Sequence, residues 1–222
     1  MIKHTLPSDI ERTSMGIITQ ELADKGYSFP EEQMAVVKRV IHTSADFDYA
    51  ENLVFVNDPV ARGMEALKSG AHIITDTMMA FSGVSKIALR ALGGEAHCYI
   101  ADPEIAAAAK ANGTTRSAAA VEYAAEKFPK GIFAVGNAPT ALIELIERMK
   151  KGLRPSLIIG VPVGFVNVVE SKEMMREFCE ETGVPAILAM GRKGGSNVAA
   201  AICNALIYTA TDRIDPANRG WN

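Results

Sequence analysis

From residue 72 onward, short apolar runs rich in β-branched side chains alternate with longer segments whose apolar residues recur at helical spacing. The short runs predict strands at residues 72–75, 96–100, 131–135, 157–161 and 185–190. Strands that alternate with helices are typical of a parallel sheet covered by helices on both faces. We therefore expect an α/β fold with three layers, α/β/α, around a mainly parallel sheet of about five strands.

Three helical segments begin with a residue that suits a helix N-terminus. Asp102 precedes an alanine-rich run at 106–125, Asn137 precedes residues 142–149, and Ser171 stands at the start of the third segment. These side chains accept hydrogen bonds from the first N–H groups of a helix, and in the first two segments a proline also fits the first turn. The pattern predicts a capped helix in each segment.

Two further helical patterns, at residues 10–25 and 31–41, precede the alternating part of the chain. We expect these N-terminal helices to pack beside the sheet or at a subunit contact. Neither an internal repeat nor a long Pro/Gly/Ser linker divides the sequence. The sequence therefore predicts one domain over residues 1–222.

Charge and composition narrow the range of partners. The 222 residues are 48% hydrophobic, which suffices for one substantial core, and 23 basic against 26 acidic residues leave a net charge of -3. The longest basic run is Lys150-Lys151, so nucleic acid is not an expected partner. Because we find neither a long apolar stretch nor a signal-peptide pattern after Met1, we expect no membrane contact and a cytoplasmic location.

The three cysteines, Cys98, Cys179 and Cys203, lie far apart and form no C-x-x-C pair. We interpret them as reduced and mostly buried thiols. His4, His72 and His97 show no cysteine or carboxylate cluster at metal-ligand spacing, so we predict no catalytic metal. Phosphate-loop, dinucleotide and serine-nucleophile motifs are also missing from the sequence.

The loop after the last predicted strand carries the first candidate site. In open parallel sheets ligands bind beyond the carboxyl ends of the strands. Arg192 and Lys193 supply positive charge there, and Gly194, Gly195 and Ser196 let backbone amides approach an anion ahead of a helix at residues 197–211. A tight strand-to-helix turn with two solvated basic residues explains the pattern equally well.

The second candidate is His42, which follows an apolar helix face and stands close to Asp46 and Asp48. These groups can give and take protons near neutral pH. On spacing alone, a structural interpretation is favoured, in which His42 ends the helix and the two aspartates are solvated turn residues.

Four segments, in order and spacing, resemble the precorrin-8X methylmutase family over about residues 10–206. They are Ile41-His42-Thr43-Ser44-Ala45-Asp46-Phe47-Asp48-Tyr49, Gly136-Asn137-Ala138-Pro139-Thr140, Gly160-Val161-Pro162-Val163-Gly164 with Glu170-Ser171-Lys172, and Gly191-Arg192-Lys193-Gly194-Gly195-Ser196. The resemblance implies a three-layer α/β homodimer that moves a methyl group from C11 to C12 of precorrin-8X or cobalt-precorrin-8. The product would be hydrogenobyrinic acid or its cobalt form, cobyrinic acid.

The resemblance also implies roles for particular residues. The histidine matching His42 would assist a [1,5]-sigmatropic shift as an acid, and no cofactor is implied. Substrate contacts are implied for residues in the early helix, in the loops and at one further arginine: Ser14, Thr75, Asp76, Thr77, Arg116, Asn137, Arg192, Lys193, Gly194, Gly195 and Ser196. Met15, where an aromatic is expected, and Ser44, where threonine is commoner, depart from the family pattern.

Two other functions stay open on the sequence. A tetrapyrrole-binding carrier would use the same carboxylate-binding loops without a proton donor at His42. A methyltransferase would require S-adenosylmethionine as an external methyl donor, whereas a methylmutase moves an internal methyl group and needs no such donor.

Overall fold

The computed structural model describes residues 6–219, so the ends of the predicted domain, with His4, lie outside the described residues. One sheet contains six strands in the order β1-β6-β5-β4-β2-β3. The strands are β1 (Leu53–Val56), β2 (Ile73–Thr75), β3 (Ala96–His97), β4 (Ile132–Val135), β5 (Leu157–Gly160) and β6 (Ala186–Ala189). All neighbours pair in parallel except β1 and β6. The predicted α/β fold with a mainly parallel sheet is confirmed.

Two strands differ from the prediction. Strand β1 was missed, because its four residues lie among the N-terminal helices and pair antiparallel with β6 at one edge of the sheet. Strand β3 has two residues instead of the five expected at 96–100, because the chain turns after it and the N–H of Asp102 donates to the carbonyl of Tyr99.

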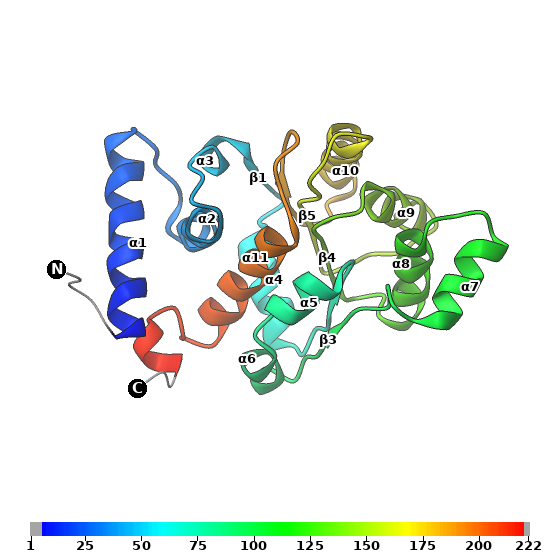
Figure 1. Ribbon diagram of the computed structural model, residues 1–222, viewed down its shortest axis with the longest axis horizontal. Helices are drawn as coiled ribbons and strands as arrows, with labels where there is room; N and C mark the ends of the chain where they lie inside the picture. The colour runs from blue at the N-terminus through cyan, green and yellow to red at the C-terminus, as the bar shows by residue number, and fades with distance from the viewer. Residues whose placement is uncertain (1–5, 220–222) are drawn as a thin grey trace.

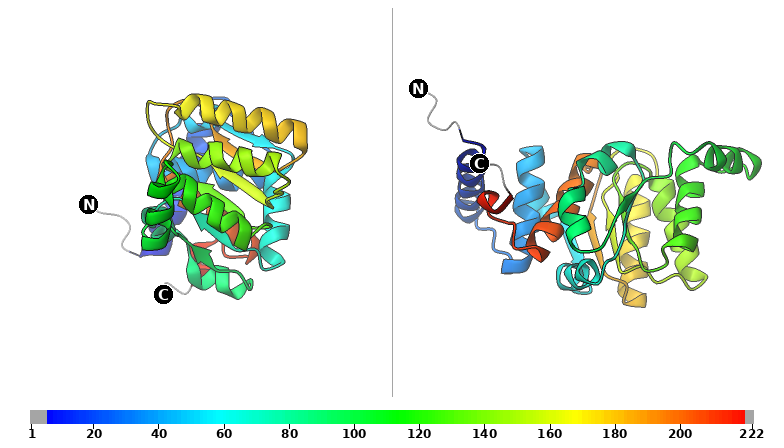
Figure 2. Two further views of the ribbon diagram at one scale, coloured as in Figure 1. Left: turned by 90° about the vertical axis from the view of Figure 1, so that its right-hand side faces the viewer. Right: turned by 90° about the horizontal axis from the view of Figure 1, so that it is seen from below.

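Helices cover both faces of the sheet (Figures 1 and 2). Successive strand residues point to opposite faces, so Ile132 and Ala134 enter one core, whereas Phe133 and Val135 enter the other. The first face is covered by α4 (Pro59–Lys68), α5 (Met78–Gly83), α6 (Lys86–Ala91) and α11 (Ser196–Ala210), and the second by α8 (Arg116–Lys127), α9 (Pro139–Lys150) and α10 (Val168–Thr182). The three-layer arrangement is therefore confirmed.

The N-terminal helices add a further layer outside α11. Helix α2 (Glu31–Ser44) packs on α11, α1 (Pro7–Asp24) packs on α2, and the short α3 (Tyr49–Asn52) leads into β1 (Figure 1). The C-terminal 3-10 turn η1 (Pro216–Arg219) lies against α1, where the Glu11 carboxylate pairs with Arg39 and Arg219. Among residues 6–219, no helix combines the length and apolar character that crossing a bilayer requires.

The alanine-rich run at 106–125 forms two helices rather than one. Helix α7 (Pro103–Ala111) ends before Gly113, whose φ of 62° breaks the helical path. Helix α8 then begins after Thr115, whose hydroxyl accepts a hydrogen bond from the N–H of Ala118. High alanine content favours helix, but it does not prevent an interruption by Gly and Thr residues that suit helix ends.

Of the three predicted caps, only Asp102 is confirmed, since its carboxylate accepts a hydrogen bond from the N–H of Glu104. The predicted cap at Asn137 is wrong, because α9 makes no cap with its own preceding side chains and is capped from β2 instead, as described below. Ser171 is also wrong as a cap, because α10 begins three residues earlier and buries this serine in its first turns.

The three cysteines are free thiols, and Cys179 and Cys203 are buried as predicted.

Candidate active site

The loops that follow β2, β4, β5 and β6 meet at the carboxyl edge of the sheet, and the carboxylate of Asp76 joins two of them. Asp76 is 5% exposed. Its Oδ1 accepts a hydrogen bond from the N–H of Gly136, and its Oδ2 accepts from Asn137 and Ala138, each at 2.8 Å. Burial raises the pKa of Asp76, and these N–H groups oppose that rise. The carboxylate is engaged by the protein itself, and its predicted substrate contact stays a prediction.

The hydroxyl groups of Thr77 and Ser196 connect β2 with α11. Their oxygens are 2.8 Å apart, and Thr77 Oγ1 also accepts a hydrogen bond from the N–H of Ala80 at the start of α5. Thr75 donates its hydroxyl hydrogen to the backbone carbonyls of Thr77 and His97, at 3.2 and 3.3 Å. The predicted residues Thr77 and Ser196 therefore hold the beginnings of α5 and α11 together, and Thr75 joins the loop after β2 to β3.

The basic loop after β6 meets the segment that follows α2. Lys193 Nζ lies 2.6 Å from one carboxylate oxygen of Asp46 and 2.6 Å from one of Asp48. The hydrogen bond with Asp46 raises the pKa of Lys193 and lowers the pKa of Asp46. The two predicted candidate segments are thus brought together, and the two aspartates are ion-paired rather than merely solvated. This pairing balances the charge of Lys193, whereas the exposed Arg192 lies over the ring of Phe165 at 5.5 Å from its centroid.

The two glycines of this loop allow close packing of backbone on backbone. A Cβ atom on Gly194 would lie 2.1 Å from the carbonyl oxygen of Val161. Gly195 has φ of 139°, and its N–H donates to the same carbonyl oxygen at 2.9 Å. The Gly195 amide predicted to face an anion is therefore used to join the loops that follow β5 and β6.

Lys172 lies beneath the surface and holds the basic loop at residues 191–196 through hydrogen bonds. The sequence patterns do not predict it as a functional residue. It is 0% exposed, and its Nζ donates to the carbonyl oxygens of Gly191 at 2.9 Å and Lys193 at 2.8 Å. Burial lowers the pKa of Lys172 to about 8. Its position on α10, four residues after Val168 and three before Met175, places it on the buried face, and this spacing was the available signal.

His42 stands in the last turn of α2, and its exposed side chain lines a surface cavity of about 310 Å³ between α2, α5 and α11. The walls are formed by residues of those helices, including Arg39, Thr43, Met79, Asn197 and Asn204. Met79 and Asn197 follow closely after Thr77 and Ser196, so the hydroxyl pair positions the cavity wall. A larger, mostly apolar cavity of about 560 Å³ lies between α1, α2 and residues 214–216, but it does not contain His42. We therefore place the candidate chemistry in the smaller cavity.

None of the predicted substrate contacts is among the residues that line the His42 cavity, and three of them stand on other helices or at their starts. Ser14 is half-buried on α1, and Arg116 and Asn137 are exposed at the starts of α8 and α9. A hydrogen bond of 2.9 Å between the hydroxyls of Thr115 and Thr140 holds those two helix starts together. The substrate contacts of these three residues stay predictions.

Comparison with known proteins decides the family. A sequence model described as Precorrin-8X methylmutase matches residues 9–209, which include all the predicted site residues. The chain belongs to the precorrin-8X methylmutase family. Methylmutases are isomerases, which move a methyl group within one molecule.

Relatives in this methylmutase family match over nearly their whole length. The cobalt-precorrin-8 methylmutase of Salmonella typhimurium is 46% identical over 207 residues, which cover 91% of this chain and 95% of that protein. The precorrin-8X methylmutase of Pseudomonas aeruginosa is 40% identical over 205 residues, with 92% and 95% covered. The crystal structure of the precorrin-8X methylmutase from Thermus thermophilus superposes with a TM-score of 0.81 at 40% identity, covering 91% of this chain and 98% of that one. The methylmutase fold and the predicted family are therefore confirmed.

Proposed function

We propose that this chain catalyses the migration of a methyl group from C11 to C12 of precorrin-8X or cobalt-precorrin-8, giving hydrogenobyrinic or cobyrinic acid. The observation that carries the proposal is the family match over residues 9–209, which includes the exposed His42. Relatives named for either substrate match at similar coverage. Both forms of the macrocycle are therefore included in the proposal.

His42 is the proposed acid. Its imidazole lines an open cavity, so it can approach ring C of a bound macrocycle and donate a proton or a hydrogen bond to the rearranging π-system. The bond between the methyl group and C11 breaks as the bond to C12 forms, so no external methyl donor takes part. General acid catalysis of this kind contributes about 10²–10⁴-fold to the rate.

The carboxylate side chains of the macrocycle are proposed to bind to the basic and polar loop residues. Arg192 is exposed at the carboxyl edge of the sheet and can form charge-assisted hydrogen bonds. Lys193 has further N–H hydrogens, but its charge is shared with Asp46 and Asp48. We therefore expect Arg192 to contribute more than Lys193 to substrate affinity.

The test uses purified protein incubated with precorrin-8X and, separately, with cobalt-precorrin-8, in each case without S-adenosylmethionine. The absorption spectrum reports formation of the corrin chromophore. Turnover of either substrate supports the proposal, and a preference identifies the natural one. Folded protein that binds a substrate stoichiometrically without converting it would instead support the carrier and contradict the proposal.

The variant His42→Ala tests the role of the histidine. We expect turnover to fall by about 10²-fold or more while substrate binding persists, because an acid acts mainly on the barrier. Glu32→Ala, an exposed residue in the first turn of the same helix, is the matched control and should retain turnover. Near-normal turnover in His42→Ala would remove the histidine from the mechanism without affecting the proposed reaction.

We also propose that the protein is a homodimer located in the cytoplasm. Several large apolar side chains support an interface, since Phe165 is 83% exposed and Val166 is 76% exposed, close to Arg192. Sedimentation velocity should give a dimer at micromolar concentration, and a monomer would contradict the proposal. Cell fractionation tests the location.

A further inference from the structure

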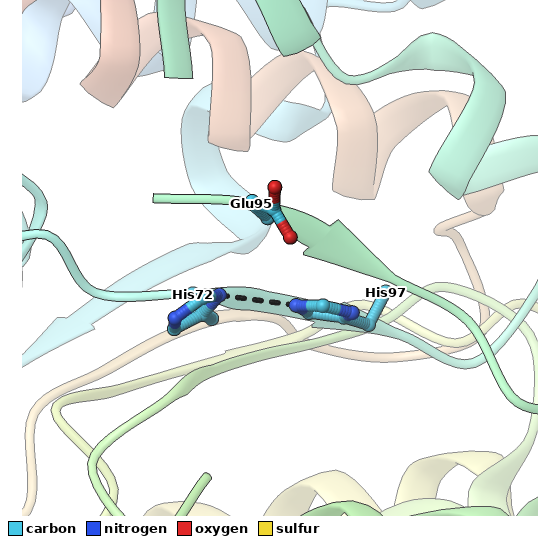
Figure 3. Close-up of side chains that lie close together, drawn as sticks. All are labelled: His72, Glu95 and His97. Carbon is cyan, nitrogen blue, oxygen red and sulfur yellow. Dashed lines mark hydrogen bonds between the residues drawn. The ribbon is translucent and has the colours of Figure 1, made fainter. Parts of the chain in front are cut away.

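Two histidines and a glutamate that the proposed function does not use come together at the far edge of the sheet (Figure 3), although the sequence spacing predicted no metal-ligand cluster at His72 or His97. His72 directly precedes β2, and Glu95 and His97 flank Ala96 in the edge strand β3. Since side chains alternate along a strand, Glu95 and His97 share a face, and His72 shares that face with Ile74. Ile74 belongs to the core beneath α8 and α9, so the three side chains lie on that side of the sheet.

The ligand atoms of the three residues are close to one another. His72 Nδ1 and His97 Nε2 are 3.0 Å apart, and one potential ligand atom from each residue lies within 4.8 Å of the others. Figure 3 shows one carboxylate oxygen of Glu95 turned towards the two rings. Two imidazoles on a tetrahedral zinc ion, with Zn–N bonds of about 2.0–2.1 Å, place their nitrogens about 3.3 Å apart. The present separation of the nitrogens is within a few tenths of an ångström of that value.

The side chains around His72 and His97 restrict the two imidazole rings and set the charge near them. The ring of Phe128 lies 4.9 Å from the His72 ring and 4.5 Å from the His97 ring, centroid to centroid, which restricts both imidazoles. Burial lowers the pKa of His97, and the neighbouring His72 lowers it further. A neutral imidazole nitrogen is the form that binds a metal ion. The negative charge of Glu95 lies near His97 and favours a bound cation there, whereas the nearby positive charge of Lys127 disfavours one.

We propose that His72, Glu95 and His97 bind a divalent metal ion of the zinc class. Two imidazoles and one carboxylate are a ligand set that zinc accepts, whereas magnesium and calcium prefer oxygen ligands. In the hydrogen bond between the rings, either His72 Nδ1 or His97 Nε2 carries the proton. When both of these nitrogens bind the ion, that proton moves to the other nitrogen of the same ring. Because Glu95 is exposed, solvent can supply the fourth ligand. The ion joins β3, which has only two residues, to β2 and thereby stabilises the sheet edge.

The proposal is tested by titrating Co²⁺ into tag-free protein that has first been treated with a chelator. Tetrahedral Co²⁺ absorbs visible light, so we expect a saturable spectrum with one ion per chain that Zn²⁺ displaces. His97→Phe retains an aromatic ring against Phe128, and Glu95→Gln retains the size of the side chain. Each variant should weaken binding about tenfold or more, since each removes one of three ligands. Glu104→Gln, which alters an exposed glutamate on α7, should bind like the wild type.

Cys98 follows His97 in the sequence and is a free thiol, so it is tested as an alternative ligand. Cys98→Ser should retain the spectrum and the affinity, and we expect Zn²⁺ to raise the melting temperatures of this variant and of the wild type by the same amount. The proposal is overturned if the wild type shows no saturable binding of one ion. It is also overturned if binding survives in both His97→Phe and Glu95→Gln, or if it depends on Cys98 instead.

Discussion

Replacing the buried Lys172 with methionine should change how the stability of the protein depends on pH. The lysine is 0% exposed, and burial lowers its pKa from the usual 10.5 to about 8. Each pKa unit corresponds to about 1.4 kcal/mol, so keeping this ammonium charged inside the fold costs about 3 kcal/mol. Lys172→Met removes that cost, but it leaves the carbonyl oxygens of Gly191 and Lys193 without their donor.

The direction of this pH effect is set by the protons that Lys172 binds in the folded and in the unfolded protein. Below pH 8 the side chain is protonated in both states, so its cost is fully present. Between about pH 8 and 10.5 the unfolded chain retains the proton and the folded chain has lost it, so the free energy of unfolding rises with pH. The wild type should therefore gain up to about 3 kcal/mol relative to Lys172→Met as the pH rises from 7.5 to 10.5.

Urea denaturation of both proteins across this pH range measures the difference directly, and other titrating groups cancel in it. Lys151→Met, at an exposed position, is the control whose difference from the wild type should stay constant with pH. A difference for Lys172→Met that is also constant within about 0.5 kcal/mol would refute the assignment of Lys172 as a buried charge. Methylmutase turnover of Lys172→Met at pH 7 reports separately whether the basic loop keeps its place.

Denaturant unfolding of three further variants, one of them with a control, tests contacts that hold the fold together. Asp76→Asn should destabilise the fold by about 2–3 kcal/mol, because an amide replaces a carboxylate that accepts three backbone hydrogen bonds; a loss below about 0.5 kcal/mol would contradict this role. Gly194→Ala should cost about 1–3 kcal/mol because its Cβ meets a carbonyl oxygen, whereas Gly16→Ala, with open space on α1, should be neutral or stabilising. Glu11→Gln should cost about 2 kcal/mol, since two arginines lose their shared carboxylate; unchanged stability would show that their charges are compensated elsewhere.

Much of the fold could be predicted from local pattern, because buried parallel strands and amphipathic helices differ in period. The predicted ranges of β2, β4, β5 and β6 agree with the structure within one residue at each end. Strand β1 was missed because its four residues gain their structure from pairing with β6, which lies more than a hundred residues away in the sequence. The break between α7 and α8 was missed because alanine content dominated the turn signal at Gly113.

The candidate site was predictable only in parts. The segments containing His42 and Lys193 were both identified, but the ion pair between Lys193 and Asp46 joins positions 147 residues apart and depends on the tertiary fold. The cap of α9 also depends on the tertiary fold. The sequence predicts Asn137 as the cap, but the carboxylate of Asp76, which follows β2, takes that role. Lys172 was overlooked because charged side chains are usually placed at the surface, although its helical spacing pointed inward.

The carboxylate of Asp76 also helps to explain which ligands this architecture rejects. In many α/β proteins the start of a helix beyond a parallel strand receives a phosphate group through free N–H groups. Here the start of α9 already holds an anion that belongs to the chain itself. A nucleotide phosphate would have to displace the Asp76 carboxylate, which is part of the chain, is held by three hydrogen bonds and is nearly inaccessible to solvent. This helix start is therefore closed to phosphate by occupancy, even though its geometry would suit one.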